Sequence, residues 1–303
     1  MRRKGYGRDF GLSARMALTT FLLGLLYVGV FVLLIQLFNF SLVAVILLMG
    51  GLLLVQLWTS DKLALRAAGA QIVERDEAPD LHEMVERLCA MADLPKPRIA
   101  VIDTDVPNAF ATGRSPKHSV VAVTRGLWQR LEPREVEGVL AHELSHIANR
   151  DVVTMTIASF FSMVAAIMIR YGLYAGMFSG NNRDNNAVPV WLILFLVSLV
   201  TYVISYILIM ALSRYREYAA DRGSALITGA PEHLMSALQK IASRITQIPQ
   251  RDLREVAGMN AFFIMPTSWK QSFGQVFMTH PPLEKRLAAL AEIAREMGRP
   301  VPV

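Results

Sequence analysis

AHELSHIANRDVVTMTIASFFSMVAAIMI, residues 141–169, combines two features that seldom share one segment. Its first residues place two histidines and a glutamate at a spacing typical of metal ligands. Within ten residues the segment becomes an apolar run of the kind that enters a lipid bilayer. This junction decides the fold, because it attaches a candidate metal site directly to a candidate membrane helix.

The composition indicates a membrane protein. The chain has 303 residues, of which 53% are hydrophobic and 18% charged, whereas soluble domains carry about 25% charged residues. Four apolar stretches reach the roughly 20 residues that a spanning helix needs, and they show no polar stripe. These stretches are residues 16–38, 41–58, 152–178 and 188–213. We therefore predict four transmembrane helices in two hairpins.

The distribution of basic residues predicts the orientation of the spans. Five basic residues precede the first span, and the loops within both hairpins are short and carry little charge. By the positive-inside rule the N-terminus is cytoplasmic. The first apolar run is too long for a cleaved signal and lacks a small-residue cleavage site. Since four spans return the chain to its starting side, both termini and both large polar stretches are expected in the cytoplasm.

The predicted organisation is a basic leader, two membrane hairpins and two cytoplasmic parts. Their bounds, in chain order, are 1–15, 16–58, 59–151, 152–213 and 214–303. The segments RIAVIDT (98–104) and SVVAVTRG (119–126) predict buried strands of a small sheet. The remaining patterned segments predict helices, which are expected over 81–93, 133–150, 231–245 and 282–297.

HELSH, residues 142–146, predicts a zinc site on a helix. His142 and His146 stand at i and i+4, so one helix face presents both imidazoles. Catalytic zinc binds neutral imidazole nitrogen and keeps one position for water, and Glu143 projects beside that position as a base for the water proton. Isolated histidines more often cap a surface or pair with carboxylates, and we interpret the others in this way: His82, His118 and His233.

Glu217 is the candidate third ligand for a single zinc ion. Glu217 lies 29 residues after Val188, the start of the fourth span, and Phe178, the end of the third span, lies 32 residues after His146. We assume that each of these two stretches is one continuous helix. These separations correspond to about 44 Å and about 48 Å of helix, so both exceed the hydrocarbon core of about 30 Å by a similar length. An antiparallel hairpin therefore brings Glu217 level with the histidines. An ion pair with a neighbouring arginine is its alternative role.

Asp221 lies one turn beyond Glu217 on the same helix face. A carboxylate there is placed to accept a hydrogen bond from the distal N–H of a ligand histidine, which fixes the tautomer of the ring. An ordinary helix-surface aspartate is the alternative interpretation.

The ordered series HELSH, REYAADRGSA and THPPLEKR resembles the HtpX-like membrane metallopeptidases, and more distantly the type 1 CAAX prenyl endopeptidases. The resemblance covers most of the chain, including two N-terminal spans. It implies that His142, His146 and Glu217 are zinc ligands and that Glu143 is the catalytic carboxylate. Together with the patterning it predicts a mainly α integral membrane protein whose zincin-like α+β cytoplasmic catalytic domain contains a small β-sheet.

The same resemblance implies roles for His280 and Arg286 in catalysis. Peptide hydrolysis develops negative charge on the carbonyl oxygen, and a preorganised donor at that oxygen lowers the barrier. His280, and Arg286 one to two helical turns later, are candidate donors. The alternative for the THPP segment is a cap that leads into a proline-initiated helix.

NAFATG resembles the substrate-binding edge strand of this family. An edge strand offers unpaired N–H and C=O groups to an extended peptide, and a strand-to-turn segment without a partner is the alternative. The predicted substrate-binding residues are Asn108, Ala109, Phe110 and Ala111. The chain departs from the family pattern in its first hairpin, which has almost no extracytoplasmic loop, so substrate sensing on that face is in doubt.

The leading interpretation is a stress-linked zinc endopeptidase of a prokaryotic plasma membrane that cleaves unfolded, misfolded or damaged (membrane) proteins on the cytoplasmic side. A dedicated processing peptidase for a lipidated or signal-like peptide is the alternative, although four spans are few to enclose a chamber. A scaffold or transporter with a vestigial HELSH is a third hypothesis, and the spans contain few polar residues at mid-membrane for transport.

Nucleic acid is not expected as a partner, because the net charge of +6 is spread along the chain. The oligomeric state, and whether residues 246–278 cover the site, stay open.

Overall fold

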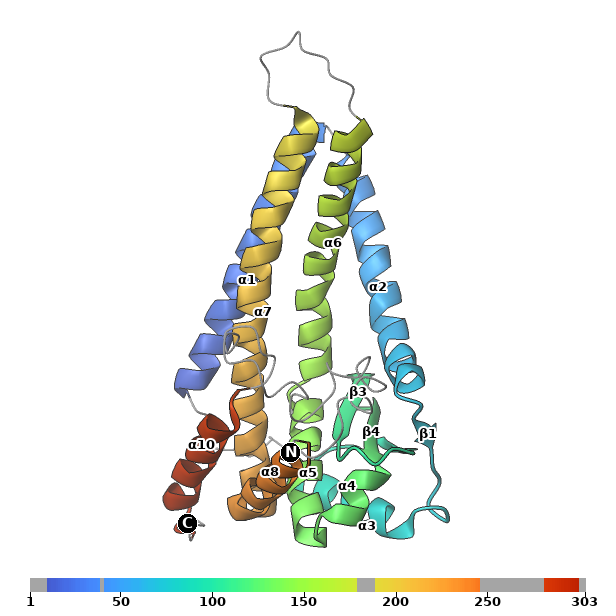
Figure 1. The fold of residues 1–303 in the computed structure, drawn as a ribbon, viewed down its shortest axis with the longest axis vertical. Helices are drawn as coiled ribbons and strands as arrows, with labels where there is room; N and C mark the ends of the chain where they lie inside the picture. Colours follow the sequence, from blue (N-terminus) through green and yellow to red (C-terminus); the bar gives the residue numbers. More distant parts are fainter. Residues whose placement is uncertain (1–9, 39–40, 179–188, 246–280, 300–303) are drawn as a thin grey trace.

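The structure is a computed structural model that describes residues 10–38, 41–178, 189–245 and 281–299. Four long apolar helices extend from one end of a part built of shorter helices and a small sheet (Figure 1). The long helices are α1 (Phe10–Phe38), α2 (Leu42–Ala67), α6 (Asp151–Phe178) and α7 (Val190–Thr228). Each is long and apolar enough to cross a membrane, as the sequence predicts.

The long helices extend beyond the predicted spans. α2 continues to Ala67, past the predicted end of the apolar run at residue 58, and α7 is one uninterrupted helix of 39 residues. Therefore α7 carries Glu217 from the apolar bundle into the polar part of the molecule, as predicted.

The prediction of one continuous helix from His146 to Phe178 is wrong. The helix that carries HELSH, α5 (Pro133–Ala148), ends before residue 149, and α6 begins only at Asp151. Arg150 between them has a φ of 56°, and a residue in the left-handed region ends a helix. The candidate metal site and the third long helix are therefore joined by a sharp break.

The sheet has four strands in the order β1-β2-β4-β3. Its strands are β1 (Gln71–Ile72), β2 (Arg98–Ile102), β3 (Ala109–Ser115) and β4 (His118–Thr124). β2 and β4 are parallel, whereas β3 pairs antiparallel with β4. The two predicted buried strands are confirmed, and β3, which contains most of NAFATG, lies at the sheet edge. The short β1 was not predicted.

Shorter helices enclose the sheet and α5. They are α3 (Pro79–Ala92), α4 (Arg125–Arg130), α8 (Pro231–Ile245) and α10 (Leu283–Glu296), and each of the four predicted helices has a counterpart. The apolar side of α5 is fully buried, with Leu140 and Leu144 at 0% exposure in the main core cluster. Since this packing covers the helix from several directions, the HELSH side chains are held on a rigid element.

Gly223 on α7 permits a close approach between α7 and α5. A Cβ at this position would lie 2.3 Å from Ser145 Oγ, far inside van der Waals contact. The next residue, Ser224, donates a hydrogen bond to the Gly138 carbonyl at 2.7 Å. Glycine at this point therefore lets α7 lie against the HELSH helix, which sets the distance between Glu217 and the histidines.

Candidate metal centre and active site

His142, His146 and Glu217 converge as predicted. Their ligand atoms all lie within 4.8 Å of one another, although two residues come from α5 and one from α7. The two Nε2 atoms of the histidines are 3.2 Å apart. Glu217 places one carboxylate oxygen 3.6 Å from His142 Nε2 and the other 3.5 Å from His146 Nε2. All three residues are buried.

This triangle fits the ligand spacing of zinc. Zinc binds imidazole nitrogen and carboxylate oxygen at about 2.0–2.2 Å in tetrahedral geometry, which separates neighbouring ligand atoms by about 3.3–3.6 Å. The two histidine nitrogens are 3.2 Å apart, and they lie 3.6 and 3.5 Å from different oxygens of the Glu217 carboxylate. Two nitrogens and one carboxylate are also the donor set of many catalytic zinc sites, with the fourth position left for water. The residues present therefore fit this metal.

Negative charge around the first histidine also favours a cation. Burial by itself lowers the pKa of His142, but the neighbouring carboxylates of Asp221 and Glu217 outweigh it and raise that pKa to about 9. A positive charge at this ring is thus stabilised by its surroundings. The same negative carboxylates would also stabilise a divalent cation bound beside this ring.

Asp221 lies against His142, as predicted. Its Oδ1 is 3.0 Å from His142 Nδ1, the ring nitrogen that faces away from Glu217. Arg286 holds the same carboxylate from the other side, donating from Nε at 2.9 Å and from Nη2 at 2.6 Å. Arg286 Nη1 is also 3.6 Å from Glu217 Oε2. Because Arg286 is completely buried, these contacts favour a role in positioning the metal ligands, and its predicted contact with the reacting carbonyl stays a prediction.

Asp151 and Arg216 make a matching arrangement around the second histidine, which sequence reasoning missed. Asp151 Oδ2 lies 2.7 Å from His146 Nδ1, and Arg216 Nε lies 3.1 Å from Asp151 Oδ1. Asp151 is 2% exposed. Each histidine of the metal cluster is thus backed by a carboxylate, and each carboxylate is backed by an arginine from another element.

Glu143 lies beside the cluster and next to the open edge of the sheet. Burial, the largest effect, raises the pKa of Glu143, and the negative charge of Glu217 raises it further. The two histidines and a hydrogen bond from the Ala111 backbone lower this pKa. The net effect is a raised pKa, which makes the carboxylate a better proton acceptor near neutral pH. Since Ala111 belongs to β3, the candidate base and the candidate substrate strand are in direct contact.

The other predicted substrate residues lie along the same strand. Ala109 and Phe110 are buried in β3, and Asn108 just before it is fixed by hydrogen bonds between its backbone and the Thr124 side chain at 2.9 and 3.0 Å. Because β3 is an edge strand, one row of its backbone groups does not pair with β4. Of the predicted catalytic residues, His280 lies outside the described residues.

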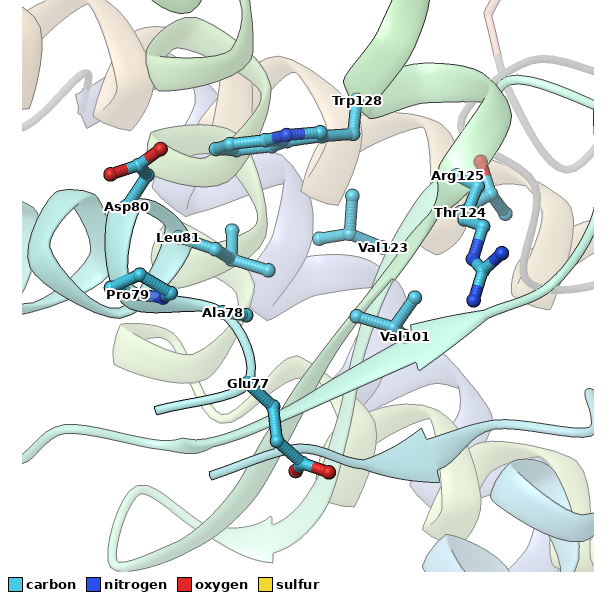
Figure 2. Close-up of a pocket in the computed structure, with 10 residues that line it drawn as sticks. All are labelled: Glu77, Ala78, Pro79, Asp80, Leu81, Val101, Val123, Thr124, Arg125 and Trp128. Carbon is cyan, nitrogen blue, oxygen red and sulfur yellow. The ribbon is translucent and has the colours of Figure 1, made fainter. Parts of the chain in front are cut away.

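A cavity of about 280 Å³ is lined by residues outside the cluster. Figure 2 shows it between α3 and α4, with the indole of Trp128 opposite Leu81 and the strand residues Val101 and Val123. None of its lining residues belongs to the group of potential metal ligands. The arrangement that supports hydrolytic chemistry is therefore the cluster on α5 and α7.

Comparison with known proteins agrees with this geometry. The model of peptidase family M48 matches residues 75–294, which includes α5, the cluster and most of α10. The chain belongs to peptidase family M48. Protease HtpX homolog 2 of Methanosarcina acetivorans is 51% identical over 299 residues, covering 98% of this chain and 100% of that protein. Protease HtpX homologs of Moorella thermoacetica and Pyrococcus furiosus are 49% and 43% identical, over 97% and 80% of this chain.

The protein is accordingly an HtpX-family multi-pass membrane zinc metalloprotease. A solved structure, that of S. mikatae Ste24p, resembles it with a TM-score of 0.55 at 20% identity, covering 92% of this chain and 65% of that chain. This likeness shows that the two chains share a fold. The predicted family and fold class are thus confirmed.

Replacing the carboxylate behind His146 should weaken metal binding. We expect Asp151→Asn to raise the zinc dissociation constant about 10–100-fold, because the neutral amide orients and polarises the imidazole less well. Asp221→Asn should have a similar effect through His142. Competition with a chromophoric chelator measures both constants on the purified chain. Asp105→Asn, at an exposed position, is the matched control, and an unchanged constant in Asp151→Asn would argue against this role.

Proposed function

We propose that the protein hydrolyses peptide bonds of misfolded or damaged membrane proteins on the cytoplasmic side of the plasma membrane, as part of proteolytic quality control under stress. The observation that carries this proposal is the contact between Glu143 and the edge strand β3. An extended substrate segment that pairs with β3 passes beside Glu143 and the metal cluster. Backbone pairing recognises extended chains with little dependence on side chains, which suits unfolded substrates.

The proposed mechanism assigns one task to each residue. His142, His146 and Glu217 would hold one zinc ion, which when bound lowers the pKa of a water molecule and polarises the substrate carbonyl. Glu143 takes the proton of the attacking water and returns it to the leaving nitrogen. The backbone of β3, including residues Asn108 to Ala111, holds the substrate extended. Asp221 and Asp151 keep the imidazoles in the orientation that directs Nε2 to the metal.

The proposed topology places both termini and the whole catalytic part in the cytoplasm. The proposed membrane hairpins are 16–58 and 152–213, and the flanking regions 1–15, 59–151 and 214–303 lie on the cytoplasmic side. The basic leader supports this orientation through the positive-inside rule. The position of the cluster just beyond the apolar parts of α6 and α7 supports cleavage close to the membrane surface.

A comparison of whole-cell proteins tests the proposed function. Cells that express the active chain, or its Glu143→Gln variant, are stressed, and newly formed protein termini are compared by mass spectrometry. Quality control predicts many cleaved membrane proteins with cytoplasmic cleavage sites and loose sequence preference. A single cleaved protein would instead indicate a processing peptidase, and cleavage sites on the outer face would contradict the proposed topology.

A processing peptidase for lipidated peptides is the second candidate, and one observation favours it. A cavity of about 700 Å³ lies between α1, α2 and α6, with an almost entirely apolar lining. Its lining extends from Ile35 and Leu42 near one end of the helices to Thr154 and Leu212 close to the metal cluster. This volume lies within the usual range for ligand sites and would take a single aliphatic chain.

Filling this cavity separates the two candidates. Gly50 lines the cavity, and a Cβ added there meets no atom within 4 Å, so Gly50→Leu projects into open space. If the enzyme processes lipidated peptides, this variant should cleave a lipidated peptide at least about tenfold more slowly, with unchanged cleavage of an unfolded protein. Gly51→Leu, which adds the same side chain beside the cavity, is the control. Equal rates on the lipidated peptide would remove the second candidate.

A further inference from the structure

The β3–β4 hairpin lies at the foot of the membrane helices. Its turn and the adjoining strand ends share a small cavity with Arg150, Val152 and Val153, so the turn faces the break between α5 and α6. β3 also contacts α2 and α6, and Figure 1 shows it beside the lower ends of these helices. Because the apolar run of α6 starts at Val152, the turn stands at the level where that helix would enter the hydrocarbon.

Trp58 marks the same level on α2. The guanidinium carbon of Arg114, at the end of β3, lies 4.4 Å from the centre of the Trp58 ring. Trp58 is 59% exposed and closes the predicted apolar stretch of its helix. Tryptophan is enriched at the boundary between lipid tails and headgroups. Two independent helices therefore place the hairpin turn at the headgroup layer.

The exposed charge at this level is positive. Lys117 in the turn and Arg150 at the helix break are exposed, and Arg114 is partly exposed. The carboxylates of Asp61 on α2 and of Asp151 at the start of α6 are both buried, at 4% and 2% exposure. The segment 112–120 contains no acidic residue. Clustered lysine and arginine beside a membrane attract anionic lipids.

We propose that the hairpin turn, with Arg114, Lys117 and Arg150, binds the phosphate-bearing headgroups of anionic phospholipids. This contact holds β3 against the bilayer surface, so that its open edge meets polypeptide emerging from the membrane. The inference rests on the proposed topology for the side of the membrane, but not on the identity of the substrates. Each positive charge strengthens such a contact about fivefold, and salt weakens it.

A fluorescent label on the hairpin tests the contact directly. The only cysteine, Cys89, is buried, and burial raises the pKa of its thiol to about 11, so an introduced cysteine takes the label selectively. His118→Cys places the label beside the turn. Asp103→Cys is the control position. Asp103 follows Ile102 of β2, which pairs with Thr124 at the end of β4 opposite the turn, so a label there lies far from the turn. The full-length chain, inactivated by Glu143→Gln, is reconstituted in vesicles that carry a nitroxide on some lipid headgroups.

Replacing part of the phosphatidylcholine by phosphatidylglycerol should increase quenching at residue 118 at least about twofold and leave residue 103 unchanged. Arg114→Gln combined with Lys117→Gln should return quenching at 118 to its value in phosphatidylcholine alone. The matched control is Arg134→Gln, which removes an exposed charge at the far end of α5. This readout is independent of activity, so it separates failure of the lipid contact from failure of the proposed function.

Two results would overturn the proposal. Equal quenching at residue 118 in both lipid mixtures would show that the turn does not select anionic headgroups. If inorganic phosphate abolished the phosphatidylglycerol effect and potassium chloride of the same ionic strength did not, the turn would bind free phosphate instead of lipid.

Discussion

The full-length chain carrying Glu143→Gln will retain zinc but cleave an unfolded test protein about 10²–10⁴ times more slowly than the unchanged chain. Glu143 is absent from the triangle formed by His142, His146 and Glu217, so its replacement leaves the metal donors in place. The amide oxygen of glutamine can still accept the hydrogen bond from the Ala111 backbone, which preserves the local packing. Only the capacity to take a proton is lost.

The measurement combines metal analysis with cleavage of an unfolded protein in detergent or vesicles. Glu137→Gln is the matched control, because Glu137 lies on the same helix and forms an ion pair with Arg87 away from the cluster. Chelation by phenanthroline should abolish cleavage in the unchanged chain, and added zinc should restore it. Cleavage by Glu143→Gln at more than about a tenth of the normal rate would refute the role of this carboxylate as the base.

The convergence of α5 and α7 could be predicted from the sequence because both are governed by helix geometry. The i and i+4 spacing of His142 and His146 requires only a helix. The position of Glu217 follows from α7, which continues without interruption over 39 residues. The matching continuous helix expected from His146 to Phe178 is broken at Arg150, so that half of the length argument does not hold. Periodicity and length therefore indicate which residues form the ligand set, whereas the distances between them depend on the packing of α7 against α5 at Gly223.

Asp151 could not be identified in the same way. Its contact with His146 depends on the break between α5 and α6, and no residue typical of a helix break marks that position in the sequence. On a continuous helix a residue at i+5 from His146 projects from a different face. The left-handed conformation of Arg150 turns the chain, and Asp151 returns to His146. Neither proline nor glycine marks this position. A carboxylate five residues after HExxH is a signal that could be sought in other sequences, but only together with a helix break.

The apolar cavity among α1, α2 and α6 is not an enclosed chamber, so the expectation that four spans are few to enclose one stays a prediction. Helix count limits a closed chamber, whereas glycine residues such as Gly24 and Gly50 let a cavity of about 700 Å³ form between splayed helices. The sequence contains these glycines, but the faces they occupy follow only from the packing.

Replacing Arg286 by methionine will cost about 3–5 kcal/mol of folding stability and will also weaken zinc binding. Arg286 is fully buried and donates two hydrogen bonds to Asp221, which is itself fully buried. Removing the guanidinium leaves the Asp221 carboxylate without its counter-ion in a region that excludes water, and an uncompensated buried charge has a cost of this size. Because Asp221 also contacts His142, a displaced Asp221 would no longer hold this ligand in place, and zinc binding would weaken.

Thermal unfolding in detergent and chelator competition for zinc distinguish this positioning role from the predicted direct role in catalysis. A positioning residue predicts a lower melting temperature and a higher zinc dissociation constant, with cleavage restored in part by excess zinc. A direct contact with the carbonyl oxygen predicts normal stability and zinc binding with a lower turnover number alone. Arg295→Met on the same helix, where the side chain is exposed and paired with Glu292, is the control. Arg286→Met combined with Asp221→Asn should recover part of the stability, because the buried charge and its partner are then removed together.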